Sequence, residues 1–268
     1  MHAPFSGSLA SVDGSITLAS AATIPATDEG LLRGDGVFEV IRVYDGHPFA
    51  LEEHLRRLER SALNLRLPLD VEAVRADANR LLAHAGAGPD HELLRIVITR
   101  GGQRLLLTEA LSPTAEQIRL GSVTYSPTRV LDGVKSLSYA ANMLSSRLAR
   151  ERGYDEALLV TPHGRVLEAP TSSIFWVKAE EVLTPPLDDH ILASITRRIV
   201  IERAGAKERP CTLEELGAAD EAFIASTTRE VQPVSAIDEW TFPAPGPVTA
   251  RVAATVGEAI RSELAPAR

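Results

Sequence analysis

The sequence predicts an α+β protein of two domains. Short alternating or wholly apolar segments joined by tight turns occur in both halves and are typical of β-hairpins. Amphipathic segments with apolar residues at helical spacing are grouped around these hairpins, which is the arrangement of an α+β protein. A polar, proline-containing segment, residues 112–117, predicts a connection between an N-terminal domain, residues 1–114, and a C-terminal domain, residues 118–268.

The first half predicts a hairpin followed by two helices and a strand. Residues 36–50 alternate and turn at Asp45-Gly46, a preferred hairpin turn. Residues 51–65 carry leucine and alanine at helical spacing with charges elsewhere, which predicts an amphipathic helix. Asp70 can cap a second helix that extends to about residue 85, and residues 91–99 read as a strand.

The second half predicts a similar mixture. A capping box is expected at Thr212, and Ser194 or Thr196 is expected to cap a helix. The remaining expectations are a strand near 119–126, a helix over 138–152, a hairpin over 156–169 that turns at 162–164, a buried strand over 172–177, the capped helix over 194–206, another strand over 221–227, and a closing helix near 247–263.

Composition narrows the class of protein. A net charge of −8 and a pI near 5.4 argue against a nucleic-acid partner, because phosphate binding needs a basic face. The single cysteine, Cys211, allows no intrachain disulfide and no multi-cysteine metal site. No leader and no long uncharged apolar run is visible, so a cytoplasmic protein without a membrane partner is expected.

The sequence lacks the motifs of several common nucleotide-binding proteins, hydrolases and metal sites. Neither GxGxxG after a strand nor the phosphate loop GxxxxGK[ST] is present, and no GxSxG elbow is found. The histidines never fall in HxxxH or HExxH spacing, so no metal site is expected.

Six short motifs, taken in order, resemble one enzyme family. They are EEHLRRL (52–58), GVKSL (133–137), GYDEALLV with GRVLEA (153–169), LTPP (183–186), SITR (194–197) and STTREVQPV (226–234). Their order and spacing resemble the class IV aminotransferases, the fold-type IV pyridoxal-phosphate enzymes. The resemblance covers about residues 28–240 and implies a two-domain homodimer with pyridoxal 5′-phosphate at the domain interface.

The resemblance assigns the covalent and ring contacts of the cofactor to Lys135 and Glu168. A lysine amine must bond to the cofactor aldehyde and later move a proton. Lys135 is the only cation of residues 132–143, and its neighbours Val134 and Leu137 are uncharged. Glu168, at the end of GRVLEA, matches the carboxylate that keeps the pyridine nitrogen protonated. From the residues alone, a solvated lysine and an exposed strand-end glutamate stay open.

The phosphate contacts implied by the resemblance come from three places. Arg57 in HLRRL offers a guanidinium that can pair bidentately with phosphate, although its neighbour Arg56 is an alternative. Ile195 and Thr196 open a helix, where backbone N–H groups bind anions. Hydroxyls come from the turn that follows a strand. The residues that provide them are Ser226 and Thr227. The alternatives are a simple helix cap and a polar turn.

The substrate contacts are the least determined by the motifs. Arg104 follows a strand near the position where D-amino-acid enzymes carry a carboxylate-binding arginine, but it equally suits a solvated loop. Phe38 stands where several D-specific relatives have tyrosine. Tyr139, four residues after the lysine, suits either a cofactor contact or the core. Ser173-Ile174-Phe175 replaces the family's frequent Asn-x-Phe, which leaves a cofactor contact there open.

The resulting prediction is a transaminase that works on an amino acid and an α-keto acid by a ping-pong mechanism. The Lys135-Ser-Leu run is more similar to that of D-amino-acid aminotransferases, and this resemblance implies a D-amino acid as the favoured substrate. The alternatives are a branched-chain L-amino-acid or (R)-amine transaminase, an aminodeoxychorismate lyase, and a cofactor-free binding protein on the same scaffold.

Overall fold

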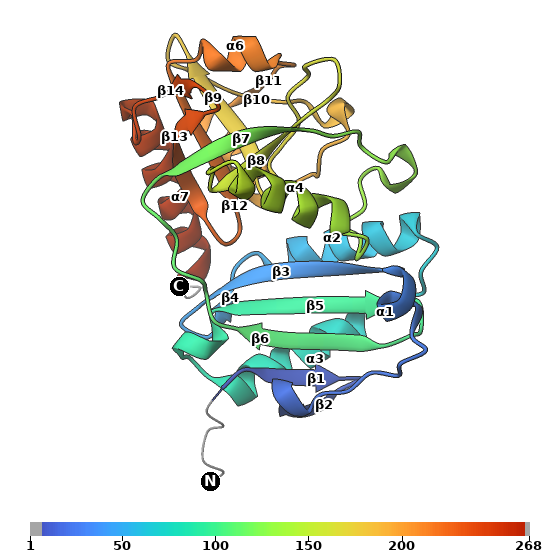
Figure 1. The fold of residues 1–268 in the computed structure, drawn as a ribbon. Helices are drawn as coiled ribbons and strands as arrows, with labels where there is room; N and C mark the ends of the chain where they lie inside the picture. The colour runs from blue at the N-terminus through green and yellow to red at the C-terminus, as the bar shows by residue number, and fades with distance from the viewer. Residues whose placement is uncertain (1–6, 266–268) are drawn as a thin grey trace. The chain divides into compact units, whose positions relative to one another are not determined.

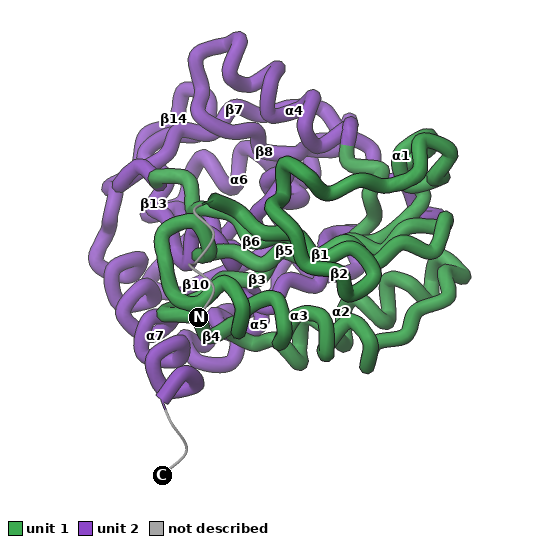
Figure 2. Tube along the Cα trace, turned by 90° about the horizontal axis from the view of Figure 1, so that it is seen from below, with its two compact units in different colours: residues 1–113, 134–139 green, residues 114–133, 140–268 purple. Residues whose placement is uncertain are grey.

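The computed structural model describes residues 7–265, which fall into two compact units. Unit 1 comprises Met1–Pro113 and Val134–Tyr139, and unit 2 comprises Thr114–Gly133 and Ala140–Arg268 (Figure 2). The boundary after Pro113 lies inside the expected connection. Residues 134–139 differ from the expectation, because they group with unit 1 although they follow the connection in sequence. The ends of the expected domains, 1–6 and 266–268, lie outside the described residues.

Unit 1 is built on a six-stranded antiparallel sheet in the order β2-β1-β6-β5-β3-β4 (Figure 1). Its strands are β1 (Leu9–Val12), β2 (Ser15–Leu18), β3 (Gly36–Tyr44), β4 (His47–Pro48), β5 (Leu93–Thr99) and β6 (Arg104–Glu109). Its helices are α1 (Glu29–Arg33), α2 (Leu51–Asn64) and α3 (Val71–Ala85), with short 3-10 turns at Ala19–Ala21 and Pro89–His91.

Alternation along the strands of unit 1 creates one apolar face under α2 and α3. In β3, Val37, Ile41 and Val43 are buried in the same cluster as leucines of both helices. The Asp70 carboxylate caps α3 by accepting from the Ala73 N–H at 3.0 Å. The apolar spacing of α2 and α3 therefore fixes which face of the sheet is covered.

Unit 2 contains a mixed eight-stranded sheet in the order β11-β10-β9-β12-β13-β7-β8, with β14 paired to β13. The strands are β7 (Ile118–Thr124), β8 (Glu156–Val160), β9 (Ser173–Lys178), β10 (Glu181–Thr184), β11 (Lys207–Glu208), β12 (Glu221–Ser226), β13 (Glu230–Ile237) and β14 (Trp240–Thr241). The helices are α4 (Ala140–Glu151), α5 (Ile195–Ala204), α6 (Leu213–Gly217) and α7 (Pro247–Leu264), with 3-10 turns at Arg129–Leu131 and Leu187–Asp189.

The central strands of unit 2 are buried on both faces. Every residue of β8 and β12 is buried, and Phe175 of β9 stacks on Phe223 of β12 with 4.8 Å between ring centroids. None of the described helices is long and apolar enough to cross a bilayer. Among residues 7–265, no group of three or more His, Cys, Asp or Glu side chains is placed to hold a metal ion.

Most of the expected elements are found close to their expected bounds. The hairpin turn at Asp45-Gly46, helices α2 and α3 and the capping box at Thr212 are confirmed, and Ser194 rather than Thr196 caps α5. In the hairpin over 156–169, β8 is a strand, but the returning arm makes only isolated bridges, such as Val160 to Val166. Strands β1, β2 and β6 were not expected.

Candidate functional site

Lys135 lies on the segment that extends along the first residues of β3 in unit 1, whereas β4 pairs with the last residues of that strand. Ser136 bridges Val37, the Phe38 N–H donates to the Lys135 carbonyl at 3.0 Å, and the Leu137 N–H donates to the Gly36 carbonyl at 2.9 Å. A Cβ at Gly36 would lie 2.4 Å from the Ile98 carbonyl oxygen, so only glycine fits there. These backbone bonds place Lys135 beside the sheet independently of its side chain.

The side chain of Lys135 rests on an aromatic pair. Its Nζ lies 4.4 Å from the centroid of the Phe38 ring and 5.8 Å from that of Tyr139. The two rings meet edge to face, with 5.3 Å between centroids and an interplanar angle of 82°. Ring faces attract a cation, and they also keep water from the amine. Of the residues expected to contact substrate, Phe38 is therefore brought to Lys135.

Arg57 lies in a buried charged cluster on the opposite face of β3. Its Nε and Nη2 donate to the two carboxylate oxygens of Glu39 at 2.7 and 2.6 Å. His54, one turn earlier on α2, contacts the same carboxylate through Nδ1 at 2.8 Å. Arg57 is buried and Arg56 is exposed, which favours Arg57 as the functional arginine of the pair. The bidentate contact holds the Arg57 guanidinium in one orientation.

The protonation states of this cluster follow from burial and pairing. Burial raises the pKa of the Glu39 carboxyl, but the Arg57 guanidinium and the hydrogen bonds from Arg57 and His54 outweigh it and lower the pKa to about 2. Burial lowers the pKa of His54, despite the opposing effect of Glu39. Among the described residues Nε2 of His54 has no partner, so a second proton there would be buried without an acceptor. His54 is therefore neutral and donates through Nδ1.

Arg104 is placed away from Lys135 within unit 1. It opens β6 opposite Ile98, and its Nε donates to Asp77 of α3 at 2.9 Å. Because side chains alternate along strands, Arg104 shares the helix-covered face with Ile98, whereas Phe38 lies on the other face. The structure thus gives Arg104 a carboxylate partner inside its own unit. Its role toward a substrate carboxylate stays a prediction.

Glu168 in unit 2 is half-buried and oriented by backbone contacts. Its Oε1 accepts from the Leu192 N–H at 3.2 Å, and its carbonyl accepts from the Leu159 N–H at 2.9 Å. Tyr125 lies near it, and burial, with the negative Glu168, raises the pKa of the Tyr125 phenol. The carboxylate is therefore held by the chain segment that leads into α5.

The start of α5 forms a potential anion site. The Ser194 hydroxyl caps the helix by accepting from the Arg197 N–H at 3.3 Å. The other first-turn N–H groups, including those of Ile195 and Thr196, have no acceptor within the helix. Both residues are buried. Backbone donors and a hydroxyl at a helix start favour a phosphate group.

A hydroxyl-rich turn joins β12 to β13. Ser226 ends β12, its Oγ accepts from the Arg229 N–H at 3.3 Å, and Thr227 follows it in the turn. Ser173 begins β9 opposite Ala225, so it lies beside this end of β12. The hydroxyls of Ser172 and Ser173 are buried, and neither has a hydrogen-bond partner among the described residues. Such buried donors fit a polar ligand at this end of the sheet.

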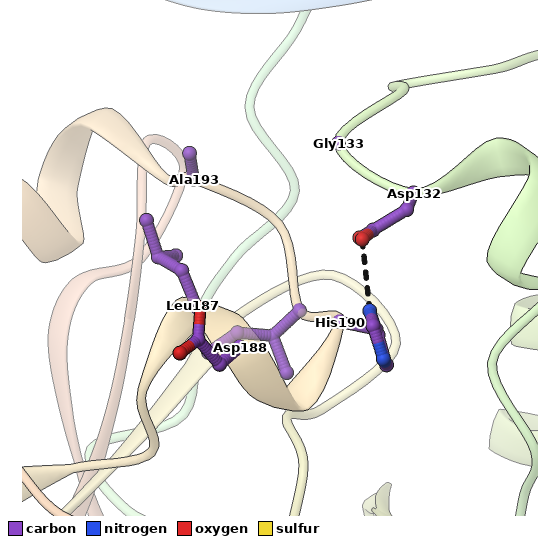
Figure 3. Close-up of a pocket in the computed structure, with 7 residues that line it drawn as sticks. Asp132, Gly133, Leu187, Asp188, His190 and Ala193 are labelled. Atoms are coloured by element: carbon purple, nitrogen blue, oxygen red, sulfur yellow. Dashed lines mark hydrogen bonds and ion pairs between the residues drawn. The ribbon is translucent and has the colours of Figure 1, made fainter.

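A small pocket of about 370 Å³ lies in unit 2 between the chain before Lys135 and the chain before α5 (Figure 3). His190 and Asp132 line it, and His190 Nδ1 lies 2.8 Å from Asp132 Oδ2. Arg129 donates to His190 Nε2 at 2.8 Å. Since arginine only donates, Nε2 accepts and the imidazole proton lies on Nδ1, facing Asp132. This chain of bonds connects residues 129–132 to residues 187–193.

Comparison with known proteins identifies the family. Residues 36–237 match the family described as Amino-transferase class IV. The chain belongs to the class IV aminotransferases. A putative branched-chain-amino-acid aminotransferase from Methanocaldococcus jannaschii is 36% identical, covering 81% of this chain and 83% of the relative. A D-alanine aminotransferase from Bacillus licheniformis is 32% identical, covering 92% and 95%. A crystal structure of a branched-chain aminotransferase from Thermoproteus uzoniensis matches with a TM-score of 0.85 and 30% identity over 96% of each chain.

Class IV aminotransferases use pyridoxal phosphate, and the residues of this aminotransferase fit that cofactor. Within unit 2, the fit rests on the helix start at Ile195 and Thr196 and on the buried hydroxyls of Ser172 and Ser173, which have no hydrogen-bond partner among the described residues. Within unit 1, it rests on the amine of Lys135 over Phe38. The family match and the similar solved structures confirm the fold-type IV assignment.

Sequence reasoning missed Glu39 and His54 in this aminotransferase. A signal was available, because Glu39 occupies an inward position of a strand whose other inward residues, Val37 and Ile41, are apolar. A carboxylate at such a position needs buried donors. The spacing of His54 and Arg57 places both on one face of α2. Asp132 and His190 gave no comparable signal, because they meet only through loops.

Proposed function

We propose that this aminotransferase transfers the amino group of a D-amino acid to an α-keto acid, with Lys135 as the residue that bonds to the cofactor. The observation that carries the proposal is the amine of Lys135 on the faces of two aromatic rings, a place suited to a reactive lysine. The Lys135-Ser-Leu run and the similarity to a D-alanine aminotransferase over 92% of the chain support the D preference.

The mechanism assigns a separate task to each group of residues. When bound, pyridoxal phosphate supplies an aldehyde that condenses with amines and a ring that accepts an electron pair. Nζ of Lys135 would be the base that takes the proton from the substrate Cα and the acid that later returns it. The Glu168 carboxylate, oriented by the Leu192 N–H, would keep the ring nitrogen of the cofactor protonated.

In the proposed function, the positive charge of Arg57 and a set of hydrogen-bond donors would hold the cofactor phosphate. Arg57 supplies a guanidinium whose orientation Glu39 determines. The N–H groups of Ile195 and Thr196 contribute backbone dipoles, and two further hydroxyls complete the set. These hydroxyls belong to Ser226 and Thr227. Phe38 and Tyr139 exclude water from Nζ of Lys135 and so protect the proton transfer.

A branched-chain L-amino-acid transaminase is the second candidate. The D assignment relied partly on Arg104 as a carboxylate-binding residue, and the contact of Arg104 with Asp77 gives that prediction no support. The Methanocaldococcus jannaschii relative, which is 36% identical, also supports this candidate. Phe38 in place of a tyrosine leaves the wall beside Lys135 apolar, which suits an apolar substrate side chain.

A donor screen distinguishes the candidates. The purified enzyme is incubated with D-alanine, L-leucine or (R)-1-phenylethylamine, each with pyruvate or 2-oxoglutarate, and the new amino acid is measured. The proposal expects D-alanine to be the fastest donor. L-leucine as the fastest donor supports the second candidate, and the amine as the fastest supports an (R)-amine transaminase. Pyruvate release from aminodeoxychorismate without any amino acceptor supports a lyase.

We also propose that the enzyme is a cytoplasmic homodimer. Leu144 and Leu148, one turn apart on α4, are 49% and 40% exposed, and Leu31 and Leu32 on α1 are 60% and 59% exposed. Exposed apolar residues in neighbouring positions favour a protein partner, and a second copy is the partner that the family resemblance implies. Light scattering of the purified protein should give twice the chain mass of 28.8 kDa, and Leu144→Glu together with Leu148→Glu should shift it toward 28.8 kDa.

A further inference from the structure

A buried charged cluster in unit 2 is not used by the reaction above. Its central residues are Glu156, at the start of β8, and Arg229, in the turn between β12 and β13. The Glu156 side chain is 4% exposed and the Arg229 side chain is 22% exposed. A charged pair at this depth costs desolvation free energy, so its retention calls for a physical reason.

The carboxylate of Glu156 has donors on both oxygens. Oε1 accepts from the Ser146 hydroxyl of α4 and from the Ala157 N–H at 3.1 Å. Oε2 lies 3.3 Å from Nη2 of Arg229. The carboxylate therefore connects α4, the helix that follows Lys135, to the turn after β12.

Gln232 is a second partner, besides Glu156, that holds the guanidinium of Arg229. Its Nη1 donates to Oε1 of Gln232 at 2.5 Å, and Nε2 of Gln232 donates to the Ala115 carbonyl at 2.7 Å. Gln232 is 3% exposed, so neither of its bonds competes with bulk water. Burial lowers the pKa of Arg229 while Glu156 opposes that change, and the guanidinium still carries its charge at neutral pH.

The backbone of Arg229 holds the hydroxyl-rich turn. Its N–H donates to Oγ of Ser226 at 3.3 Å, and Oγ of Ser226 lies 3.4 Å from Oγ1 of Thr228. Thr227 lies between these residues in the chain. Glu156 and Gln232 hold the Arg229 side chain, and the Arg229 N–H in turn holds Oγ of Ser226.

We propose that Arg229 is a positioning residue, clamped by Glu156 and Gln232, that fixes the 226–229 turn so that Ser226 and Thr227 bind the cofactor phosphate. The proposal rests on the proposed function, which assigns those two hydroxyls to the phosphate. It concerns the phosphate, because the hydrogen bonds of Glu156 and Arg229 described above lead to the 226–229 turn, which carries the two hydroxyls. Removing the clamp should therefore weaken the binding of ligands that carry a phosphate and leave the binding of ligands without one unchanged.

The test compares pyridoxal phosphate with pyridoxal as ligands of the apoenzyme. Binding of each aldehyde is titrated by absorbance for the wild type, Arg229→Leu, Arg229→Lys and the control Arg119→Leu. Arg119 is an arginine of the same unit whose side chain is 54% exposed. The expected result is a loss of about tenfold or more in pyridoxal phosphate affinity for Arg229→Leu, partial recovery in Arg229→Lys, and unchanged affinity for pyridoxal. The control should match the wild type with both ligands.

Two results overturn the proposal. An equal loss for both aldehydes would show that Arg229 only stabilises unit 2, and no loss for either would show that the turn keeps its conformation without the clamp. If Arg229→Leu does not fold, Gln232→Met replaces it, since this change removes the neutral acceptor of Arg229 and the donor to the Ala115 carbonyl, and leaves the Glu156 contact. A several-fold loss confined to pyridoxal phosphate is then expected, and an equal or absent loss overturns the proposal. A wild type that binds both aldehydes equally would instead contradict the assignment of Ser226 and Thr227.

Discussion

Lys135 differs from the other lysines of this chain in what surrounds its amine. The sequence contains three lysines, and the other two form ion pairs at the surface: Lys178 with Asp220 at 3.3 Å, and Lys207 with Glu181. An amine paired with a carboxylate in solvent stays charged and unreactive toward aldehydes. The amine of Lys135 lies over the rings of Phe38 and Tyr139. These aromatic neighbours are the reason for proposing Lys135 as the reactive lysine of the aminotransferase.

Replacement of Lys135 tests this assignment. Lys135→Ala should abolish transamination and leave the cofactor bound without a covalent bond, because no other amine is placed to react. Borohydride reduction of the wild type followed by peptide mapping should label Lys135. Lys178→Ala serves as the control and should retain activity and labelling. A label on Lys178 or Lys207 would contradict the assignment.

Glu168 owes its function to charge rather than to shape. Glu168→Gln keeps the size of the side chain and its acceptor for the Leu192 N–H, but removes the negative charge. A neutral amide cannot hold the ring nitrogen protonated, so turnover should fall by orders of magnitude while much of the cofactor stays bound. The measurement is kcat together with the bound cofactor per chain. Nearly full activity would mean that Glu168 does not reach the ring.

Strand β3 and helix α2 act together through Glu39. Its carboxylate satisfies Arg57 and His54, and all three are nearly inaccessible to solvent. Glu39→Gln should destabilise the protein by about 3–5 kcal/mol, because it leaves the Arg57 charge buried without its counterion. The affinity for pyridoxal phosphate should also fall, since the guanidinium loses its fixed orientation. Urea unfolding and cofactor titration measure the two effects. Arg56→Gln, on the exposed side of α2, should change neither.

Elements whose signal is local were predictable from this sequence. Helix α2 repeats apolar residues at helical spacing, and the hairpin after β3 contains a turn dipeptide, so neighbouring residues determine both. Strands β1 and β2 have four residues each, and β1 pairs with β6 through contacts such as Ala10 with Leu107. Pairing between residues so far apart in the sequence produces no hydrophobic pattern within either short strand that could have predicted it. The same reason applies to residues 134–139, whose placement depends on bonds to β3.

In the candidate site too, features that depend on a short stretch of sequence were predictable, and contacts between distant elements were not. Motifs that carry chemistry in a short stretch, such as GVKSL and SITR, suffice to predict roles for Lys135 and Thr196. The partner of Arg104 was not predictable, because Asp77 lies on another element and α3 predicts only an amphipathic helix around it. The register of β5 and β6 determines which face of the sheet carries Arg104. Arg104 pairs with Ile98, so its side chain lies on the face that the helices cover. A shift of one residue would have turned its guanidinium to the side of Phe38.

Arg104 provides a test of this register. Asp77 is nearly buried and also contacts Arg80, so Arg104→Ala should cost about 1–3 kcal/mol of stability rather than the full cost of an isolated buried charge. Because Arg104 lies on the helix-covered face of the sheet and Phe38 lies on the other face, kcat/KM should change equally for D-alanine and for (R)-1-phenylethylamine. Urea unfolding and the two kinetic constants are measured together. A selective loss for the substrate with a carboxylate would restore the substrate-binding prediction from the sequence.

At the scale of the whole molecule, the cluster on α2 links stability to pH. His54 has a lowered pKa when folded, so below about pH 6.5 the unfolded chain binds more protons than the folded one. Stability present above that pH is therefore lost as the pH falls toward the folded pKa. The Glu39 pKa of about 2 lies below its ordinary value of 4.5, so its contribution is present above pH 4.5 and is lost as the pH falls toward 2.

The free energy of unfolding should accordingly decrease in two steps on acidification, one beginning below pH 6.5 and one below pH 4.5. His54→Gln keeps a donor for Glu39 but removes the titrating imidazole, so it should flatten the first step and leave the second. His163→Gln changes an exposed histidine of the turn at 162–164 and should leave both steps as in the wild type. Urea unfolding followed by far-UV circular dichroism between pH 3.5 and 8 measures the three profiles. Identical profiles for His54→Gln and the wild type would show that His54 takes up its proton as readily when folded as when unfolded, and would remove the reason for treating it as a neutral donor to Glu39.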